Sequence, residues 1–178
     1  MKTETPTIPP DDLQRDLVLA RPNEDQNLPH IGLAGDTYTI LLTGEDTAGR
    51  YCLIDVLVPT GGGPPLHRHD FEEMFTILEG EIEVTFRGAK SIVRAGETAN
   101  IPANAPHQFR NCSGRSARLP CMCSPAGQEE LFMAVGFPVT SRTAPPPELN
   151  EATRAALKTK AEALAAQYRT EFLHLPLQ

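Results

Sequence analysis

Residues 61–80 (GGGPPLHRHDFEEMFTILEG) constrain the fold of this chain more than any other stretch. The glycines and prolines at their start indicate a turn, and the following residues are typical of a β-strand with a glycine exit at Gly80. Alternate side chains of a strand point to the same face, so one strand through this segment places His67, His69 and Glu73 together. The sequence therefore predicts two imidazoles and a carboxylate that converge.

A second stretch, residues 96–111 (GETANIPANAPHQFRN), supplies a third histidine, His107, on a further predicted strand. The two stretches match G-x5-HxH-x3-E-x6-G and G-x5-P-x-G-x2-H-x3-N at nine of ten fixed positions. This motif pair resembles the cupin superfamily. The one departure is Asn104, which stands where the family has glycine. Asparagine tolerates a positive φ better than other non-glycine residues, so we expect the turn to survive.

The resemblance implies an all-β fold, the double-stranded β-helix or jelly-roll barrel, with metal ligands His67, His69, Glu73 and His107. Three neutral imidazoles and a carboxylate suit divalent first-row metals, and four protein ligands leave room for water or substrate. We expect one divalent transition metal; Fe, Mn, Ni, Co, Cu and Zn all stay open, because occupancy depends on supply. The alternative is a barrel that keeps the fold without the metal, which the intact ligand set disfavours.

The rest of the chain fits one β-rich domain. It has 178 residues with 17 prolines and 13 glycines, which indicate many turns. Short strand patterns at 37–43, 50–58 and 81–86 are separated by glycine-containing turns. Pro120 in the strand pattern at 117–123 suggests an edge or a bulge.

Three parts are expected: an N-terminal arm (1–30), the cupin barrel (31–138), and a linker with a C-terminal amphipathic helix (139–178). The arm has an apolar cluster at 13–20 and either crosses to a neighbouring subunit or forms a loose tail. Residues 125–138 predict a short helix against the barrel. Residues 149–168 predict a long helix with Leu157, Ala161, Leu164 and Tyr168 in one stripe, packed on the outside of the barrel or on a partner.

The charge of −7 and the lack of a Lys/Arg cluster make nucleic acid and anionic membranes improbable partners and favour small molecules. The N-terminus lacks the apolar region of a signal peptide, so a cytoplasmic protein is expected. The four cysteines are then expected to be reduced, and Cys121 and Cys123, as C-x-C, are interpreted as buried strand thiols. Cupins commonly pair, so a homodimer is expected.

The pocket beside the metal is expected to be mostly apolar, lined by Phe75, Ile77, Phe109 and either Met133 or Phe132. Such a lining suits a planar or hydrophobic substrate with a few chelating oxygens. The alternative is that these side chains belong to the barrel core and contact no ligand.

Residues 37–138 resemble the quercetinase-like single-domain cupins. The resemblance implies a metal-dependent dioxygenase acting on an enol or phenolic molecule, with Glu73 both binding the metal and taking the substrate proton. Two other classes stay open: an O2-independent cupin isomerase or lyase, and a non-enzymatic cupin that binds a small molecule. No helix-turn-helix accompanies the barrel, which disfavours a transcription regulator.

Overall fold

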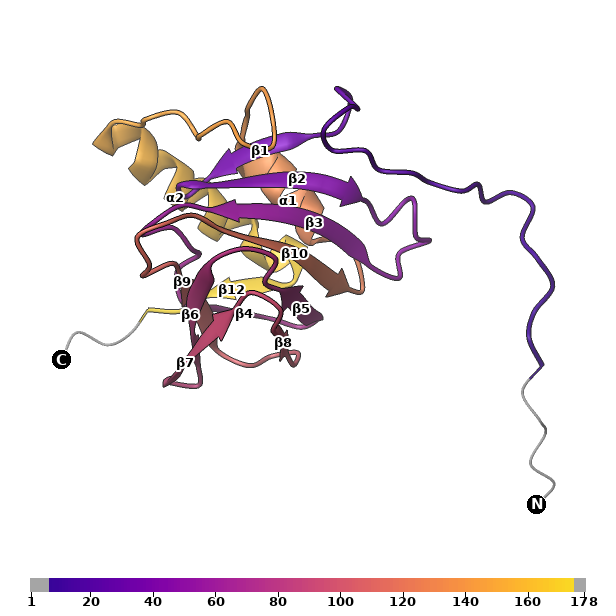
Figure 1. Cartoon of the computed structure of the whole chain (residues 1–178), viewed down its shortest axis with the longest axis horizontal. Helices are drawn as coiled ribbons and strands as arrows, with labels where there is room; N and C mark the ends of the chain where they lie inside the picture. The colour runs from indigo at the N-terminus through magenta and orange to yellow at the C-terminus, as the bar shows by residue number, and fades with distance from the viewer. Residues whose placement is uncertain (1–6, 175–178) are drawn as a thin grey trace, which may run out of the picture.

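Antiparallel strands are the main regular secondary structure of the computed structural model, which describes residues 7–174 (Figure 1). Within these residues the strands are β1 (His30–Leu33), β2 (Asp36–Leu42), β3 (Cys52–Val58), β4 (His67–His69), β5 (Glu72–Thr76), β6 (Glu81–Phe86), β7 (Ala89–Arg94), β8 (Thr98–Ile101), β9 (His107–Arg110), β10 (Ala117–Ser124), β11 (Phe137–Pro138) and β12 (Thr170–Phe172). The helices are α1 (Gln128–Val135), α2 (Glu151–Ala165) and the short 3-10 helix η1 (Ala166–Tyr168).

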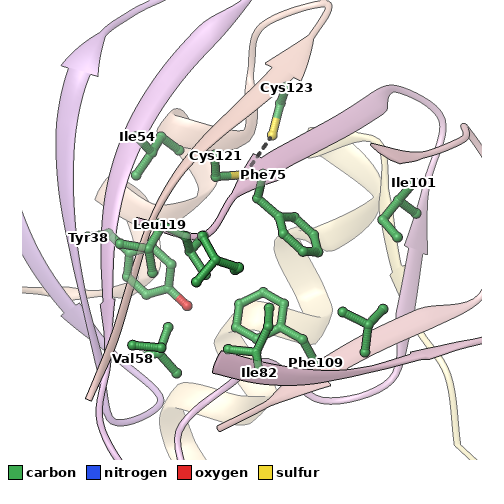
Figure 2. Packing of buried hydrophobic residues seen from close by; sticks show 14 of the residues in the cluster. Tyr38, Ile54, Val58, Phe75, Ile82, Ile101, Phe109, Leu119, Cys121 and Cys123 are labelled. Carbon is green, nitrogen blue, oxygen red and sulfur yellow. Dashed lines mark hydrogen bonds between the residues drawn. The ribbon is translucent and has the colours of Figure 1, made fainter. Parts of the chain in front are cut away.

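The strands form two sheets that enclose the core. The first sheet has the order β11-β1-β2-β3-β10-β5-β8, and the second has the order β12-β4-β9-β6-β7. Apolar side chains of both sheets meet between them, as Ile54 and Leu119 of the first sheet and Ile82 and Phe109 of the second do in Figure 2. This arrangement is a double-stranded β-helix, as the sequence predicts.

Alternation of burial along the central strands explains why these segments form the barrel wall. In β3 the even-numbered residues from Cys52 to Val58 are buried, and in β10 the odd-numbered residues from Ala117 to Cys123 are buried. Their buried faces line up because β3 and β10 pair in register, with Cys123 opposite Cys52. Full burial of an aliphatic side chain contributes about 1.5–3 kcal/mol, so these two strands are a main source of the barrel's stability.

The prediction of a single strand through His67, His69 and Glu73 is wrong. Bends at Asp70 and Phe71 divide it into β4, which belongs to the second sheet, and β5, which belongs to the first. Inner faces of the two sheets point toward each other, so the three side chains still converge from opposite walls of the barrel.

Two details of the turns agree with the sequence. Asn104 has φ 67°, so the turn before β9 keeps its left-handed residue without glycine. Opposite β10, Cys121 pairs with Phe75 and Arg118 bridges to Glu79, so residues 119–120 face residues 76–78. The chain opposite β10 therefore has one extra residue, and this bulge faces Pro120.

Both helices belong to the C-terminal part of the chain and lie side by side (Figure 1). α1 buries Leu131 and Val135 against the barrel. Asn150 caps the start of α2, and its side chain accepts a hydrogen bond from the amide of Thr153. Most side chains of α2 are exposed. After η1 the chain returns to the second sheet as β12, next to β4. No helix of the described part of the chain is long and apolar enough to span a membrane.

Residues 7–29 contain no helix or strand, and their first part extends away from the two sheets (Figure 1). Leu13 and Leu17 in this part are exposed, whereas Leu28 is half-buried. Residues 1–6 of the predicted arm lie outside the described part of the chain.

Candidate metal centre

Four side chains from three strands meet inside the barrel. His67 and His69 come from β4, Glu73 from β5 and His107 from β9. Each offers a ligand atom, and these atoms all lie within 4.8 Å of one another. All four side chains are buried. His67 also pairs directly with His107 across the sheet, which fixes the spacing of the two imidazoles.

The three imidazoles are held in one tautomer by the backbone. A carbonyl oxygen can only accept a hydrogen bond, so the ring nitrogen that faces it must carry the proton. Each Nε2 is thereby left to point toward the common centre, which is the arrangement that metal-binding histidines use. The Nδ1–carbonyl distances are 2.8 Å from His67 to Pro65, 2.9 Å from His69 to Phe71 and 2.9 Å from His107 to Ala105.

The two carboxylate oxygens of Glu73 have different surroundings. Oε2 lies 3.0 Å from Nε2 of His107 and 3.4 Å from Nε2 of His69. Oε1 points to the other side and accepts a hydrogen bond from the Cys121 thiol, with Sγ at 3.2 Å. Oε2 is therefore the oxygen that faces the imidazoles.

The electrostatics of the cluster leave Glu73 ionised and His67 neutral. Burial alone would raise the pKa of Glu73, but hydrogen bonds from His107 and His69 lower it well below its usual value. Burial and the nearby His107 lower the pKa of His67 to about 4. Burial also lowers the pKa of His107, but its hydrogen bond to Glu73 outweighs this and raises the pKa above its usual value.

This donor set fits a divalent metal. Three Nε2 lone pairs and one carboxylate oxygen form a site of intermediate hardness, and their hydrogen bonds to the backbone already fix the ring orientations. Without a cation, four buried polar side chains would have only one another as partners at the centre. A positive ion among them would offset that desolvation cost.

A cavity of about 440 Å³ reaches this cluster, with His67 and Glu73 among its lining residues. Barrel residues such as Val56, Phe109 and Leu119 form its inner part. Helix α1 contributes residues that include Leu131 and Phe132. The cavity is thus mainly apolar, with the polar cluster in one part of its wall.

The C-terminal segment supplies another part of the cavity wall. Leu157 and Ala161 of α2 line it, and so do Phe172 and Leu173 in and after β12. Leu157 and Ala161 are the first two residues of the predicted apolar stripe, so this part of the stripe faces the cavity. The sequence alone does not say whether the helix packs on the barrel or on a partner, because an apolar stripe does not identify its neighbour.

Of the predicted pocket residues, Phe109 lines the cavity, and so does Phe132, the alternative to Met133. Phe75 and Ile77 do not; they are 1% and 0% exposed and belong to the core, where the Phe75 ring lies 5.7 Å from that of Phe109 (Figure 2). Met133 is 41% exposed because it lies on the outer face of α1, away from Leu131. The assignments of Phe75, Ile77 and Met133 to the pocket are therefore corrected. For Phe75 and Ile77 the reason is that strand alternation identifies an inward side chain but not its depth.

Two further residues of the site, Tyr38 and Cys121, are not predicted from the sequence. The Tyr38 ring lines the cavity and lies 4.4 Å from that of Phe132. The interpretation of Cys121 as a buried strand thiol is confirmed, but its contact with Glu73 depends on the pairing of β10 with β5, for which the sequence has no local signal. Contact with Cys123 lowers the pKa of Cys121, whereas burial and Glu73 raise it by more, to about 12.

Comparison with known proteins identifies the family. A cupin domain matches residues 54–123. The chain is 30% identical to quercetin 2,3-dioxygenase of Bacillus subtilis over 61% of its own length, and it spans 32% of the length of that relative. It is 31% identical to an uncharacterized protein of Methanocaldococcus jannaschii over 60% of its own length and 86% of the relative.

Solved structures show the same fold. A cupin from Shewanella frigidimarina, described as RmlC-like, matches with a TM-score of 0.54 and 16% identity over 66% of this chain and 99% of the other. The polyketide cyclase RemF from Streptomyces resistomycificus matches with a TM-score of 0.53 and 19% identity over 82% of this chain and 96% of the other. With both paired motifs, the barrel and these relatives in agreement, the chain belongs to the cupin superfamily.

Proposed function

We propose that this protein is a metal-dependent dioxygenase that acts on a small, largely apolar enol or phenolic molecule. The observation that carries the proposal is the position of the His67, His69, Glu73 and His107 cluster, which opens through His67 and Glu73 into an apolar cavity. A site of this kind combines one reactive polar centre with a wall that selects for hydrophobic shape.

The cavity limits the substrate class. Its volume of about 440 Å³ lies in the range of small-molecule sites and admits a molecule of one to a few rings. The aromatic rings of Tyr38, Phe109 and Phe132 suit a planar partner. The oxygens of an enol or catechol can then approach the cluster while the rest of the molecule contacts apolar side chains.

Similarity to the quercetin 2,3-dioxygenase of Bacillus subtilis supports the reaction class. The similarity extends over 109 residues, and this chain spans only 32% of that relative. The relative's substrate is therefore a starting point for assays, and related enols and catechols belong in the same panel.

The side chains have distinct roles in this proposal. A divalent metal, when bound, supplies a Lewis acid for chelating substrate oxygens and, if redox active, a centre for reaction with O2. The Nε2 atoms of His67, His69 and His107 would hold it, together with Oε2 of Glu73. Glu73 also accepts the proton that the enol hydroxyl loses, so the proton moves from substrate oxygen to carboxylate. The apolar cavity wall excludes bulk water from that proton.

The test is an assay across flavonols, other enols and catechols, with the metal identified by elemental analysis and each reaction run with and without O2. The proposal expects turnover that consumes O2 and is lost after the metal is removed with a chelator. Metal-dependent turnover without O2 would identify an isomerase or lyase instead. Binding of the panel compounds without any conversion would identify a small-molecule-binding cupin.

A further inference from the structure

Cys121 lies on β10, and its thiol is directed at Glu73, one of the four candidate metal ligands. Its side chain is buried, and it also lines the cavity. Sγ lies 3.2 Å from Oε1 of Glu73 and 3.8 Å from Sγ of Cys123 (Figure 2 shows the two cysteines). Cys121 thus contacts the one carboxylate oxygen of the cluster that does not face the imidazoles.

The direction of this hydrogen bond follows from the chemistry of the two groups. An ionised carboxylate has no proton and can only accept, so the thiol is the donor. A carboxylate that ligates a metal can use one oxygen or both. Occupation of Oε1 by the thiol proton favours the use of Oε2 alone.

The strand pairing holds Cys121 in position. β10 is an interior strand that pairs with β3 on one side and β5 on the other, and Cys121 lies opposite Phe75 while Cys123 lies opposite Glu73. β10 and β5 are both interior strands, so the pairing fixes the backbones of Cys121 and Glu73. The cysteine side chain has fewer rotatable bonds than the glutamate side chain, so Glu73 is the side chain that adjusts to the thiol.

We propose that Cys121 is a positioning residue that holds Oε1 of Glu73 and so keeps Glu73 a one-oxygen ligand. The consequence is that a metal coordination position stays free for a chelating substrate. This inference rests on the metal site of the proposed function. It predicts that loss of the thiol donor lets Oε1 turn toward the metal and occupy that free position.

The test uses the visible absorption spectrum of Co²⁺, which responds to the number of ligands around the ion. Five proteins are loaded with Co²⁺: native, Cys121→Ser, Cys121→Ala, Cys121→Val and Cys123→Ala. Serine keeps a donor at the position, whereas alanine and valine remove it. Cys123→Ala is the matched control, since it removes the neighbouring buried thiol without removing the donor to Glu73. Circular dichroism shows whether each variant is folded.

We expect the native, Cys121→Ser and Cys123→Ala proteins to share one spectrum. Cys121→Ala and Cys121→Val should show bands of lower intensity at shorter wavelength, as an added ligand requires. Catechol, the probe for the free position, should bind these two variants about 10–100-fold more weakly, the usual effect of losing an outer hydrogen-bond partner.

Three outcomes overturn the inference. Native spectra and native catechol binding in both Cys121→Ala and Cys121→Val would show that the thiol does not control Glu73. An equal change in Cys123→Ala would assign the effect to packing of the thiols. A native protein that binds no Co²⁺ would overturn the proposed metal site, and this inference with it. In the first two outcomes the native protein binds Co²⁺, so failure of the inference alone is distinguishable from failure of the metal site.

Discussion

At His107 a metal ion and a proton compete for the same nitrogen. Nε2 of His107 lies 3.0 Å from Oε2 of Glu73, and in the metal-free protein a proton between them forms a buried ion pair. That pairing is why the pKa of His107 is raised. A metal must displace the proton to use the same lone pair.

Metal affinity should therefore depend on pH in a defined direction. Below the raised pKa of His107 the proton is present, so the affinity should fall about tenfold per pH unit as the pH decreases. Above that pKa there is no proton to displace and the affinity should level off. The pKa of His67 is about 4, so a second proton should add to the slope only near that pH. Calorimetric titration with Mn²⁺ in buffers of different ionisation enthalpy measures how many protons are released when the metal binds. If metal binding below pH 6 released no proton, this prediction would be wrong.

His107→Ala should lose most of the metal while the barrel still folds. It removes a ligand directly, so affinity should fall by more than the roughly 10–100-fold typical of losing an outer partner. His30→Ala is the control, because His30 bonds to Thr39 on β2 and is not part of the cluster. Elemental analysis after dialysis measures the metal content, and circular dichroism measures folding. Native metal content in His107→Ala would exclude this residue as a ligand.

Glu73→Gln separates the two roles of Glu73. Glutamine keeps the shape and an oxygen for the metal but is not a base, so metal should be retained through the three histidines while turnover falls by about 10²–10⁴-fold. Glu72→Gln is the matched control: Glu72 is exposed and bonds to Asn100, away from the cluster. Measured kcat and metal content decide the result. A near-native rate in fully loaded Glu73→Gln would leave Glu73 as a ligand only.

The strands show how far the sequence determines this site. His67, His69, Glu73 and His107 are predicted correctly as neighbours, because short spacings within two motifs leave little freedom in where their side chains go. The break between β4 and β5 is not predicted, since Asp70 and Phe71 are neither glycine nor proline.

The C-terminal elements are harder to predict for a different reason. The position of α2 follows from long-range packing, and an apolar stripe alone does not say which surface it covers. β12 has only three residues, and they become a strand by pairing with β4. Three residues are too short a sequence pattern to predict a strand.

The cavity wall contributed by α2 gives a test at the scale of an element. Ala161 lines the cavity, so Ala161→Trp should fill part of it and weaken binding of 3-hydroxyflavone at least about tenfold, or ~1.4 kcal/mol. Metal content should not change, because Ala161 lies outside the cluster. Ala163→Trp, on the exposed face of the same helix, controls for the effect of tryptophan on the helix. Equal flavone binding by both variants, measured by fluorescence titration, would mean that α2 does not bound the ligand site.

At the scale of the whole molecule, the N-terminal segment is joined to the barrel mainly by polar contacts. The Arg15 side chain donates to the carbonyl of Asp46 at 2.9 Å, and Arg142 donates to the Asn23 side chain at 2.7 Å. Two of its leucines stay in solvent: Leu13 is 87% exposed and Leu17 is 83% exposed. Within residues 7–174, no apolar surface of the chain covers these two side chains, and a second copy of the chain would provide one.

We therefore expect a homodimer in which the segment around Leu13 and Leu17 packs on the partner subunit. Each leucine that becomes buried contributes about 1.5–3 kcal/mol, and a symmetric dimer buries each of them twice. The double substitution Leu13→Ser and Leu17→Ser should therefore weaken the dimer at least about 100-fold. Gln14→Ser, in the same exposed segment, should leave it intact. Light scattering at micromolar concentration gives the mass, and a native mass equal to one chain would rule out the dimer. A dimeric native protein that stays dimeric after the double substitution would place the interface on the barrel instead, because the leucines would then contribute nothing to association.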